Sequence, residues 1–264
     1  MTVSRRGFLA GTAALTFAGS AAFAQDALEK ITKGGTIRIA IPTDYPPYGF
    51  SGLDLQPQGL DIDMAKLVAE KLGAKLELVP VTSANRIPYL QTGQVELVIS
   101  TLGKNEERMK VIDFTHAYAP FFQAVYAPKT MKIESFDDLA GKSIAVAKGA
   151  MEEQELAKEG PASMQFRRYE DQAAATAAFV AGQTDVIATS VSNATLMMQH
   201  NPNIGAEYKL LIKDSPCFMG ISKGQEPLLE KVNAIILAAK EDGTITALSE
   251  KWLGHAAKPE DLPL

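Results

Sequence analysis

The chain places Arg108 just after a loop that joins a strand-like apolar run to a short helix. The loop covers residues 100–104 and is followed by Asn105, a favourable N-cap. Backbone N–H groups and the helix dipole at such a position favour an anion, and an arginine in the first turn can add two parallel hydrogen bonds to a carboxylate. We therefore predict an anion site at Arg108. The alternative is a solvated arginine paired with Glu106 or Glu107.

Other residue types that do chemistry are not spaced for it. The three histidines, His116, His200 and His255, are far apart in the sequence, and the single cysteine, Cys217, has no obvious base near it. Phosphate-binding loops and glycine-rich dinucleotide motifs are missing from the sequence as well. We therefore expect no metal or cofactor, and the spacing of these residues gives no support for an enzyme.

Aliphatic strand-like runs alternate with amphipathic helices along the chain, which predicts an α/β fold with mainly parallel sheets. The helix after Gly59 carries apolar residues on one face and ends at Gly73, a C-cap glycine. A later long helix ends at Gly243, and a last short helix contains Trp252. The apolar faces of these helices are expected to lie in the core. The expected strands are residues 36–41, 75–80, 97–100, 143–147, 164–169, 186–188 and 209–212.

Residues 1–24 have the pattern of a cleaved export signal. Arg5 and Arg6 precede a weakly apolar run that ends in Ala22-Phe23-Ala24, and paired arginines are typical of twin-arginine signals. A membrane anchor is the alternative, although the glycines of this run make it only mildly hydrophobic. We therefore expect export to the periplasm and removal of this segment.

The rest of the chain, 240 residues, is acidic and long enough for two domains of ordinary size. It carries 24 basic and 31 acidic side chains, a net charge of −7, which argues against nucleic acid or an anionic membrane surface as partner. One cysteine cannot form an internal disulfide, so the fold must depend on its apolar core.

Residues 59–114 resemble the polar amino-acid-binding family of periplasmic solute-binding proteins that serve ABC importers. The run from Gly59 to Leu72 looks like the signature helix of that family, and the resemblance covers nearly the whole chain. It implies the type II periplasmic binding protein fold, with two α/β lobes that are joined by two hinge strands.

Two extended apolar runs, residues 120–126 and 216–221, are the expected crossings between the lobes. They divide the chain into a first lobe, residues 25–123 plus 219–264, and a second lobe, residues 124–218.

The resemblance also implies a role for the Arg108 loop, because the arginine of this motif holds the α-carboxylate of the ligand. Hydroxyl and N–H groups of the strand-end loop assist it in the family. Ser100, Thr101 and Gly103 occupy these places, and Gly103 offers only its backbone N–H where a hydroxyl residue is more usual.

A second arginine, Arg86, lies in a segment, residues 83–88, that is similar to glutamate/aspartate-binding members. In those members the serine and arginine, here Ser83 and Arg86, reach the side-chain carboxylate of the ligand. An arginine left buried and unpaired costs several kcal/mol, so Arg86 would select a second anion. The alternative is a salt bridge within the protein. A further basic residue, which acidic-ligand members carry near the first strand, is missing from residues 42–48.

Asp44, Tyr45 and Tyr48 look like the first ligand loop of the family, whose aromatic ring covers the aliphatic part of the ligand. Pro46 and Pro47 would stiffen this loop and reduce the entropy lost on binding. Asp44 is a candidate for the ligand's ammonium group. Packed tyrosines and a surface aspartate are the alternatives.

The expected second lobe departs from the family pattern. Ala150 and Met151 stand in the strand-end turn where hydroxyl residues are common, which leaves backbone N–H groups to assist the carboxylate. Ser190 falls where the family generally has an aspartate for the α-ammonium. Ser190, Ser192 or Asn193 are candidates to hydrogen-bond the amine in its place.

The resemblance thus implies the substrate-binding component of an ABC importer, a monomer that closes on an amino acid or a related small carboxylate and delivers it to membrane permease subunits. An acidic or polar amino acid is favoured. One competing hypothesis is an exported enzyme on the same scaffold, similar to cyclohexadienyl dehydratase, with Asp44, Glu152 or Asp185 as general acid. Another is a ligand sensor that presents its closed form to a receptor.

Overall fold

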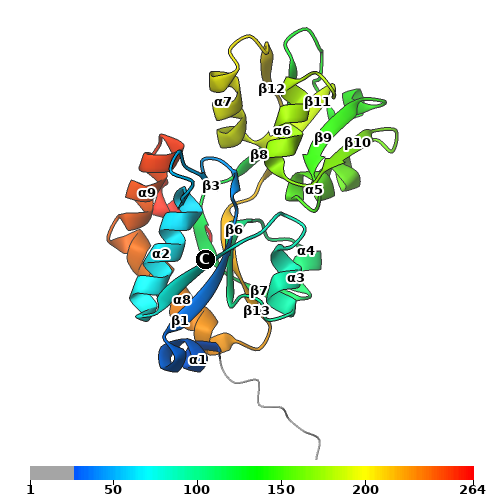
Figure 1. Cartoon of the computed structure of the whole chain (residues 1–264). Helices are drawn as coiled ribbons and strands as arrows, with labels where there is room; N and C mark the ends of the chain where they lie inside the picture. The colour runs from blue at the N-terminus through cyan, green and yellow to red at the C-terminus, as the bar shows by residue number, and fades with distance from the viewer. Residues whose placement is uncertain (1–26) are drawn as a thin grey trace, which may run out of the picture.

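Two α/β lobes are stacked end to end in the structure, a computed structural model that describes residues 27–264 (Figure 1). The expected export signal lies outside the described residues. The sheet of the first lobe has the strand order β5-β1-β6-β13-β7, in which β13 runs antiparallel to both of its neighbours. Its strands are β1 (Thr36–Ile41), β5 (Lys75–Pro80), β6 (Leu97–Leu102), β7 (Ile112–Ala119) and β13 (Cys217–Ser222).

Helices cover both faces of this sheet, so its central strands are buried on both sides, which explains their continuous apolar sequence. Ile39 of β1 packs in the core cluster on the side of α2, α8 and α9, whereas the next residue, Ala40, packs on the side of α3. The helices of the first lobe are α1 (Ala27–Gly34), α2 (Leu60–Leu72), α3 (Arg86–Gln91), α4 (Glu106–Met109), α8 (Glu226–Glu241), α9 (Thr244–Leu253) and the 3-10 turn η2 (Pro259–Asp261).

The second lobe repeats this plan with the strand order β10-β9-β11-β8-β12, and β8 is antiparallel to both neighbours. Helices α6 and α7 pack on one face, and α5 with the 3-10 turn η1 packs on the other. Its strands are β8 (Phe122–Pro128), β9 (Ser143–Ala147), β10 (Gln165–Tyr169), β11 (Val186–Ser190) and β12 (Ala206–Asp214). Its helices are η1 (Phe136–Leu139), α5 (Met151–Glu159), α6 (Gln172–Val180) and α7 (Val191–His200).

Each sheet is mainly parallel, as expected, and is mixed because one strand next to a crossing, β13 in the first lobe and β8 in the second, runs antiparallel to the others. The chain leaves the first sheet after Ala119 and returns to it at Cys217, so it crosses between the sheets at residues 120–121 and 215–216. The two crossings are joined by a hydrogen bond from Ser215 N to Phe121 O of 2.9 Å. The expected boundaries after residues 123 and 218 fall within β8 and β13.

A small antiparallel sheet, β2-β3-β4, follows β1 and reaches from the first lobe toward the second. Its strands are β2 (Asp44–Tyr45), β3 (Gly49–Ser51) and β4 (Pro57–Gln58). The glycine after it, Gly59, has φ +131°, and a Cβ there would lie 2.3 Å from Tyr48 O, so only glycine fits at the entry to α2. Within residues 27–264, no helix is both long and apolar enough to cross a membrane.

Candidate ligand site between the lobes

Arg108 lies in the first turn of α4 and is 5% exposed. The helix begins as expected, with the Arg108 backbone N–H donating to the side chain of Asn105 at 2.9 Å. The guanidinium donates from Nη1 to Gly103 O at 2.9 Å and from Nη2 to Gly149 O at 3.1 Å, so it spans both lobes. Its Nε finds no partner among the described residues. Burial lowers the pKa of Arg108 to about 10, and the group stays charged at neutral pH.

Arg86, at the start of α3, is also buried, with 4% of its surface exposed. Its Nε donates to Ser100 Oγ at 3.1 Å and its Nη2 donates to Thr101 Oγ1 at 3.0 Å. Both acceptors are neutral hydroxyls at the end of β6. The internal salt bridge considered as an alternative is not formed within residues 27–264, so these contacts orient the guanidinium without neutralising its charge.

Asp61 of α2 holds the end of β6 in place beneath the arginines. Its carboxylate accepts from the Thr101 backbone N–H at 2.8 Å and from the Tyr118 hydroxyl at 2.7 Å. Thr101 has φ +42°, a left-handed conformation that side chains with a branched Cβ rarely adopt. Burial raises the pKa of Asp61 to about 7. This bracing role was not predicted, although Asp61 belongs to the signature run.

Gly103 and Met151 fit together across the cleft. A Cβ at Gly103 would lie 2.6 Å from Ser215 Oγ and 2.8 Å from Met151 Cε, so a hydroxyl residue there would require both of these side chains to shift. Met151 is buried at the start of α5 and fills that space with apolar atoms. The two departures from the family pattern, at Gly103 and at Met151, are therefore coupled, because these residues pack against each other.

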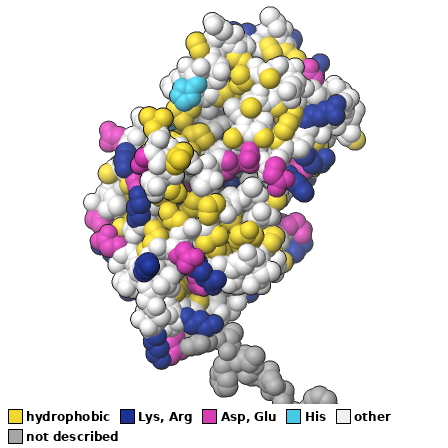
Figure 2. Space-filling model, in the orientation of Figure 1, with side chains coloured by type: hydrophobic (Ala, Val, Ile, Leu, Met, Phe, Trp, Pro, Cys, Tyr) yellow, Lys and Arg dark blue, Asp and Glu magenta, His cyan; other side chains and the backbone are white. Residues whose placement is uncertain are grey.

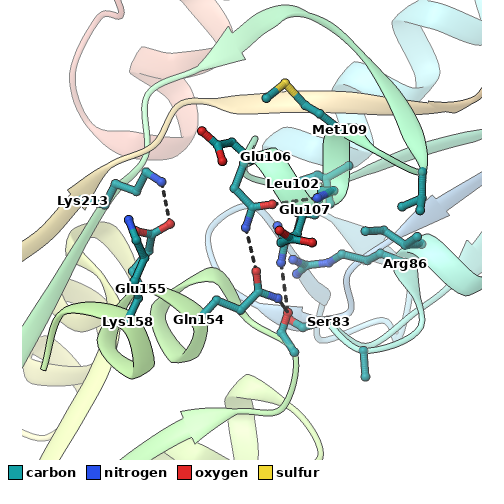
Figure 3. A pocket seen from close by; sticks show the side chains of 16 residues that line it. Ser83, Arg86, Leu102, Glu106, Glu107, Met109, Gln154, Glu155, Lys158 and Lys213 are labelled. Atoms are coloured by element: carbon teal, nitrogen blue, oxygen red, sulfur yellow. Dashed lines mark hydrogen bonds and ion pairs between the residues drawn. The ribbon is translucent and has the colours of Figure 1, made fainter. Parts of the chain in front are cut away.

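A cavity of about 840 Å³ opens beside the two arginines (Figure 3). Ser83, Arg86 and Arg108 line it from the first lobe, and Gly149 and Gln154 line it from the second. Charged side chains surround it, and the Lys213–Glu155 ion pair, 2.6 Å, closes one side. Its other lining residues are Ala84, Ile87, Leu102, Asn105, Glu106, Glu107, Met109, Val111 and Lys158.

The turn before α5 brings the second lobe against the first. Gly149 has φ +76°, and a Cβ there would lie 3.0 Å from Ala84 Cα. Its backbone N–H donates to Glu153 at 2.7 Å, which fixes the turn. Ala150 follows as the N-cap residue of α5 and is buried.

Tyr45 crosses from the first lobe into the second. Its hydroxyl accepts from Ser190 N at 3.0 Å, lies 3.1 Å from Thr189 Oγ1 and donates to Glu152 Oε1 at 3.2 Å. Ser190 Oγ accepts from Asn193 N and so caps α7. Tyr45 is therefore a polar contact between the lobes, in a cluster that is buried at every member.

Asn193, Asp44 and Tyr48 lie farther from the arginines. Asn193 Nδ2 donates to Pro46 O at 3.0 Å, and Asp44 accepts from Gln172 N at 2.8 Å. Burial raises the pKa of Asp44, and this residue and Asn193 line a separate cavity of about 380 Å³. The Tyr48 hydroxyl donates to Pro120 O at the first crossing, 2.8 Å.

Of the expected residues, Ser83, Arg86 and Arg108 line the larger cavity, and Asp44 and Asn193 line the smaller one. The structure adds one residue between the lobes. Glu152, buried in the first turn of α5, was considered only as a general acid and not as a binding residue. Its place directly after the expected turn, residues 147–151, was the available signal. Among the described residues, no group of histidine, cysteine and carboxylate side chains could hold a metal ion.

Acidic and hydrophobic side chains gather where the two lobes meet on the face shown in Figure 2. Two α/β lobes, two crossings between them and buried charged groups where the lobes meet are the features of a two-lobed solute-binding protein. The chain belongs to the bacterial extracellular solute-binding proteins, family 3, whose profile matches residues 37–255.

Curated relatives and solved structures agree with this assignment. The glutamine-binding protein GlnH of an ABC transporter from Bacillus subtilis (strain 168) is 30% identical over 237 residues, which are 87% of this chain and 85% of the relative. An ancestral arginine-binding protein bound to arginine has a TM-score of 0.78 and 33% identity, and covers 83% of this chain and 99% of its own. An ancestral amino-acid-binding protein, a precursor of cyclohexadienyl dehydratase, has a TM-score of 0.77 and 33% identity over 86% of this chain and 99% of its own.

Proposed function

We propose that this protein is the substrate-binding component of an ABC importer and that it closes its two lobes on an amino acid or a related small carboxylate. One observation carries the proposal: the Arg108 guanidinium is buried, spans backbone carbonyls of both lobes and lines the cavity between them. A carboxylate on this arginine would touch both lobes at once. Ligand therefore favours the closed arrangement by its differential affinity for it.

Arg86 supports an acidic or polar ligand. It lines the same cavity as Arg108, and neutral hydroxyls hold its guanidinium. A second carboxylate, or a polar side-chain carbonyl, would complete the hydrogen bonding of this charged group. Micromolar affinity corresponds to about −8.2 kcal/mol, and charged hydrogen bonds of roughly 1.5–3 kcal/mol each would supply much of it.

The proposal includes export and transport partners. A cleaved twin-arginine signal in residues 1–24 would deliver the protein to the periplasm, where a monomer would present the closed form to the membrane subunits of a permease. The relatives named above bind amino acids, according to their names, which favours transport over a sensor or an enzyme.

The test is thermal unfolding of the mature protein, refolded from denaturant to remove bound ligand, against amino acids, dicarboxylates and amine-free acids. Ligand at about 100 times its dissociation constant adds about 2.7 kcal/mol, a shift of several degrees for a protein of this size. No shift with any compound would contradict the proposal. Turnover of prephenate or arogenate by the same preparation would support the enzyme in its place.

Arg86→Gln separates acidic from neutral ligands in this assay. We expect the variant to lose more affinity for L-glutamate than for L-glutamine, because only glutamate carries a second carboxylate. Dissociation constants from calorimetry measure the difference. Equal losses for both compounds would mean that Arg86 reads the α-carboxylate or has a structural role.

A further inference from the structure

Glu152 is a buried carboxylate without a cationic partner in the part of the chain that the structure describes. It is 3% exposed and lies in the first turn of α5, where the second lobe contacts Tyr45 of the first, next to the residues that line the cavity of about 840 Å³ but not among them. Its side chain accepts a hydrogen bond from the Tyr45 hydroxyl at 3.2 Å. Burial raises its pKa, and a hydrogen bond from its own backbone N–H, the Tyr45 bond and the positive charges of Arg86 and Arg108 act in the opposite direction. A buried acid in such surroundings is best stabilised by a cation that arrives with the ligand.

Two buried or half-buried carboxylates that the first lobe places between the lobes accept hydrogen bonds from the backbone of other segments. Asp61 accepts from Thr101 N and Asp44 accepts from Gln172 N. The hydroxyl of Ser190, the residue expected at the ammonium position, is used to cap α7. Glu152, by contrast, is bonded to its own backbone N–H and accepts a side-chain hydrogen bond from the Tyr45 hydroxyl.

Glu152 also lies on the correct side of the arginine that is proposed to hold the carboxylate. Arg108 Nη2 donates to Gly149 O, three residues before Glu152 and in the same turn. An α-amino acid carries its ammonium one carbon atom from its carboxylate, so the two charged groups of one ligand can meet Arg108 and Glu152 together. Separation of the lobes would break the Tyr45–Glu152 hydrogen bond and leave the carboxylate free to accept one from a ligand.

We infer that Glu152 is the ammonium-binding residue of this cleft, with the hydroxyls of Tyr45 and Thr189 beside it, and that the ligand is an amine-bearing carboxylate. This inference rests on the proposed function and narrows its ligand class. In the family pattern, the negative charge for the amine lies at the position of Ser190, at the end of β11. In this protein it would lie in the first turn of α5.

The test compares each amino acid with the same molecule without its α-amine. Three pairs cover acidic, neutral and basic side chains: L-glutamate with glutarate, L-glutamine with glutaramate, and L-arginine with 5-guanidinopentanoate. Calorimetry measures their dissociation constants for the wild type and for Glu152→Gln. The variant should bind the amino acid of the recognised pair at least tenfold more weakly and its amine-free partner within threefold of the wild type.

The matched control is Glu159→Gln, at the exposed end of the same helix, which should change neither constant. Equal losses for both members of a pair, or no loss for the amino acid, would overturn the role of Glu152 while the binding function stands. Stronger binding of amine-free acids by the wild type would overturn the inferred ligand class. Failure of the wild type to bind any of the six compounds, or any compound in the wider panel, would overturn the proposed function as well.

Discussion

Two guanidinium groups lie in the cleft without an ion-pair partner among the described residues. Hydroxyls hold Arg86 and backbone carbonyls hold Arg108, so both side chains are positioned before any ligand arrives. Uncharged acceptors fix the geometry without neutralising the positive charge, which nearby carboxylates such as Glu152 balance only from outside ion-pair distance. The low dielectric of a buried site strengthens the attraction of this charge for an anion. The protein thus fixes the positions of the two guanidinium groups, and we expect an anionic group of the ligand to balance their charge.

Removal of the Arg108 guanidinium should weaken binding strongly. We expect Arg108→Ala to raise the dissociation constant of the best amino acid of the panel at least tenfold, about 1.4 kcal/mol. The dissociation constant of Arg108→Lys should lie between those of the wild type and Arg108→Ala, because one ammonium cannot reach both carbonyls and also form a two-point pair with a carboxylate. Calorimetry measures the constants, and circular dichroism checks that the fold is kept.

Arg167→Ala is the matched control, because Arg167 is exposed on β10, away from the cavity. Normal binding by Arg108→Ala would remove the anion-site argument.

At the scale of the elements, the first turn of α2 supports the end of β6. The Asp61 carboxyl accepts a hydrogen bond from the backbone N–H of Thr101, a residue in the left-handed conformation. The loop that carries Ser100, Thr101 and Gly103 therefore depends on one buried carboxyl group. Because burial raises the pKa of Asp61 to about 7, this group titrates near neutral pH.

Asp61→Asn should alter how stability depends on pH. In the unfolded chain an aspartate ionises near pH 4, whereas folded Asp61 keeps its proton up to about pH 7. Its contribution to stability is therefore present below about pH 4 and is lost as the pH rises to 7, by at most about 1.4 kcal/mol per pH unit. Asparagine cannot titrate, and its amide can still bond Thr101 N and the Tyr118 hydroxyl, so the variant should lack this loss.

Urea unfolding at pH 4.5, 6.0 and 7.5 measures the effect. The control is Asp54→Asn, in the exposed turn between β3 and β4. Parallel pH curves for the wild type and Asp61→Asn would show that Asp61 keeps an ordinary titration in the folded protein.

The elements that the sequence predicted well are those with local signals. Asn105 caps α4 and Gly73 ends α2 in the left-handed conformation, as expected, because each signal lies within four residues of its effect. The sheet β2-β3-β4 was not predicted, because strands of two or three residues show no periodicity. The Tyr45–Glu152 contact joins residues 107 positions apart in sequence, and only the packing of the two lobes reveals it.

At the scale of the whole molecule, two crossing segments connect the lobes and side-chain contacts hold them together. The crossings are hydrogen-bonded to each other, and Tyr48 binds Pro120 O in the first of them. Hydrogen bonds between the lobes lie on both sides of the arginines, from Asn193 to Pro46 O and from Asn105 to Gln154. Many weak contacts therefore hold the lobes together, and a bound ligand would add a few stronger ones.

Tyr45→Phe tests how much one such contact contributes. The change removes the hydroxyl that joins the first lobe to Ser190 N and Glu152, while the ring keeps its packing on Phe121. The net contribution of about 0.5–1.5 kcal/mol for each lost hydrogen bond should reduce the closed-to-open ratio of the ligand-free protein by roughly two- to tenfold per bond. Small-angle X-ray scattering should then give a larger radius of gyration without ligand and a wild-type value at saturation.

Tyr208→Phe, on the exposed edge strand β12, is the control and should scatter like the wild type. An unchanged radius of gyration for ligand-free Tyr45→Phe would mean that the remaining contacts set the closed fraction, and that the Tyr45 hydroxyl serves only the ligand.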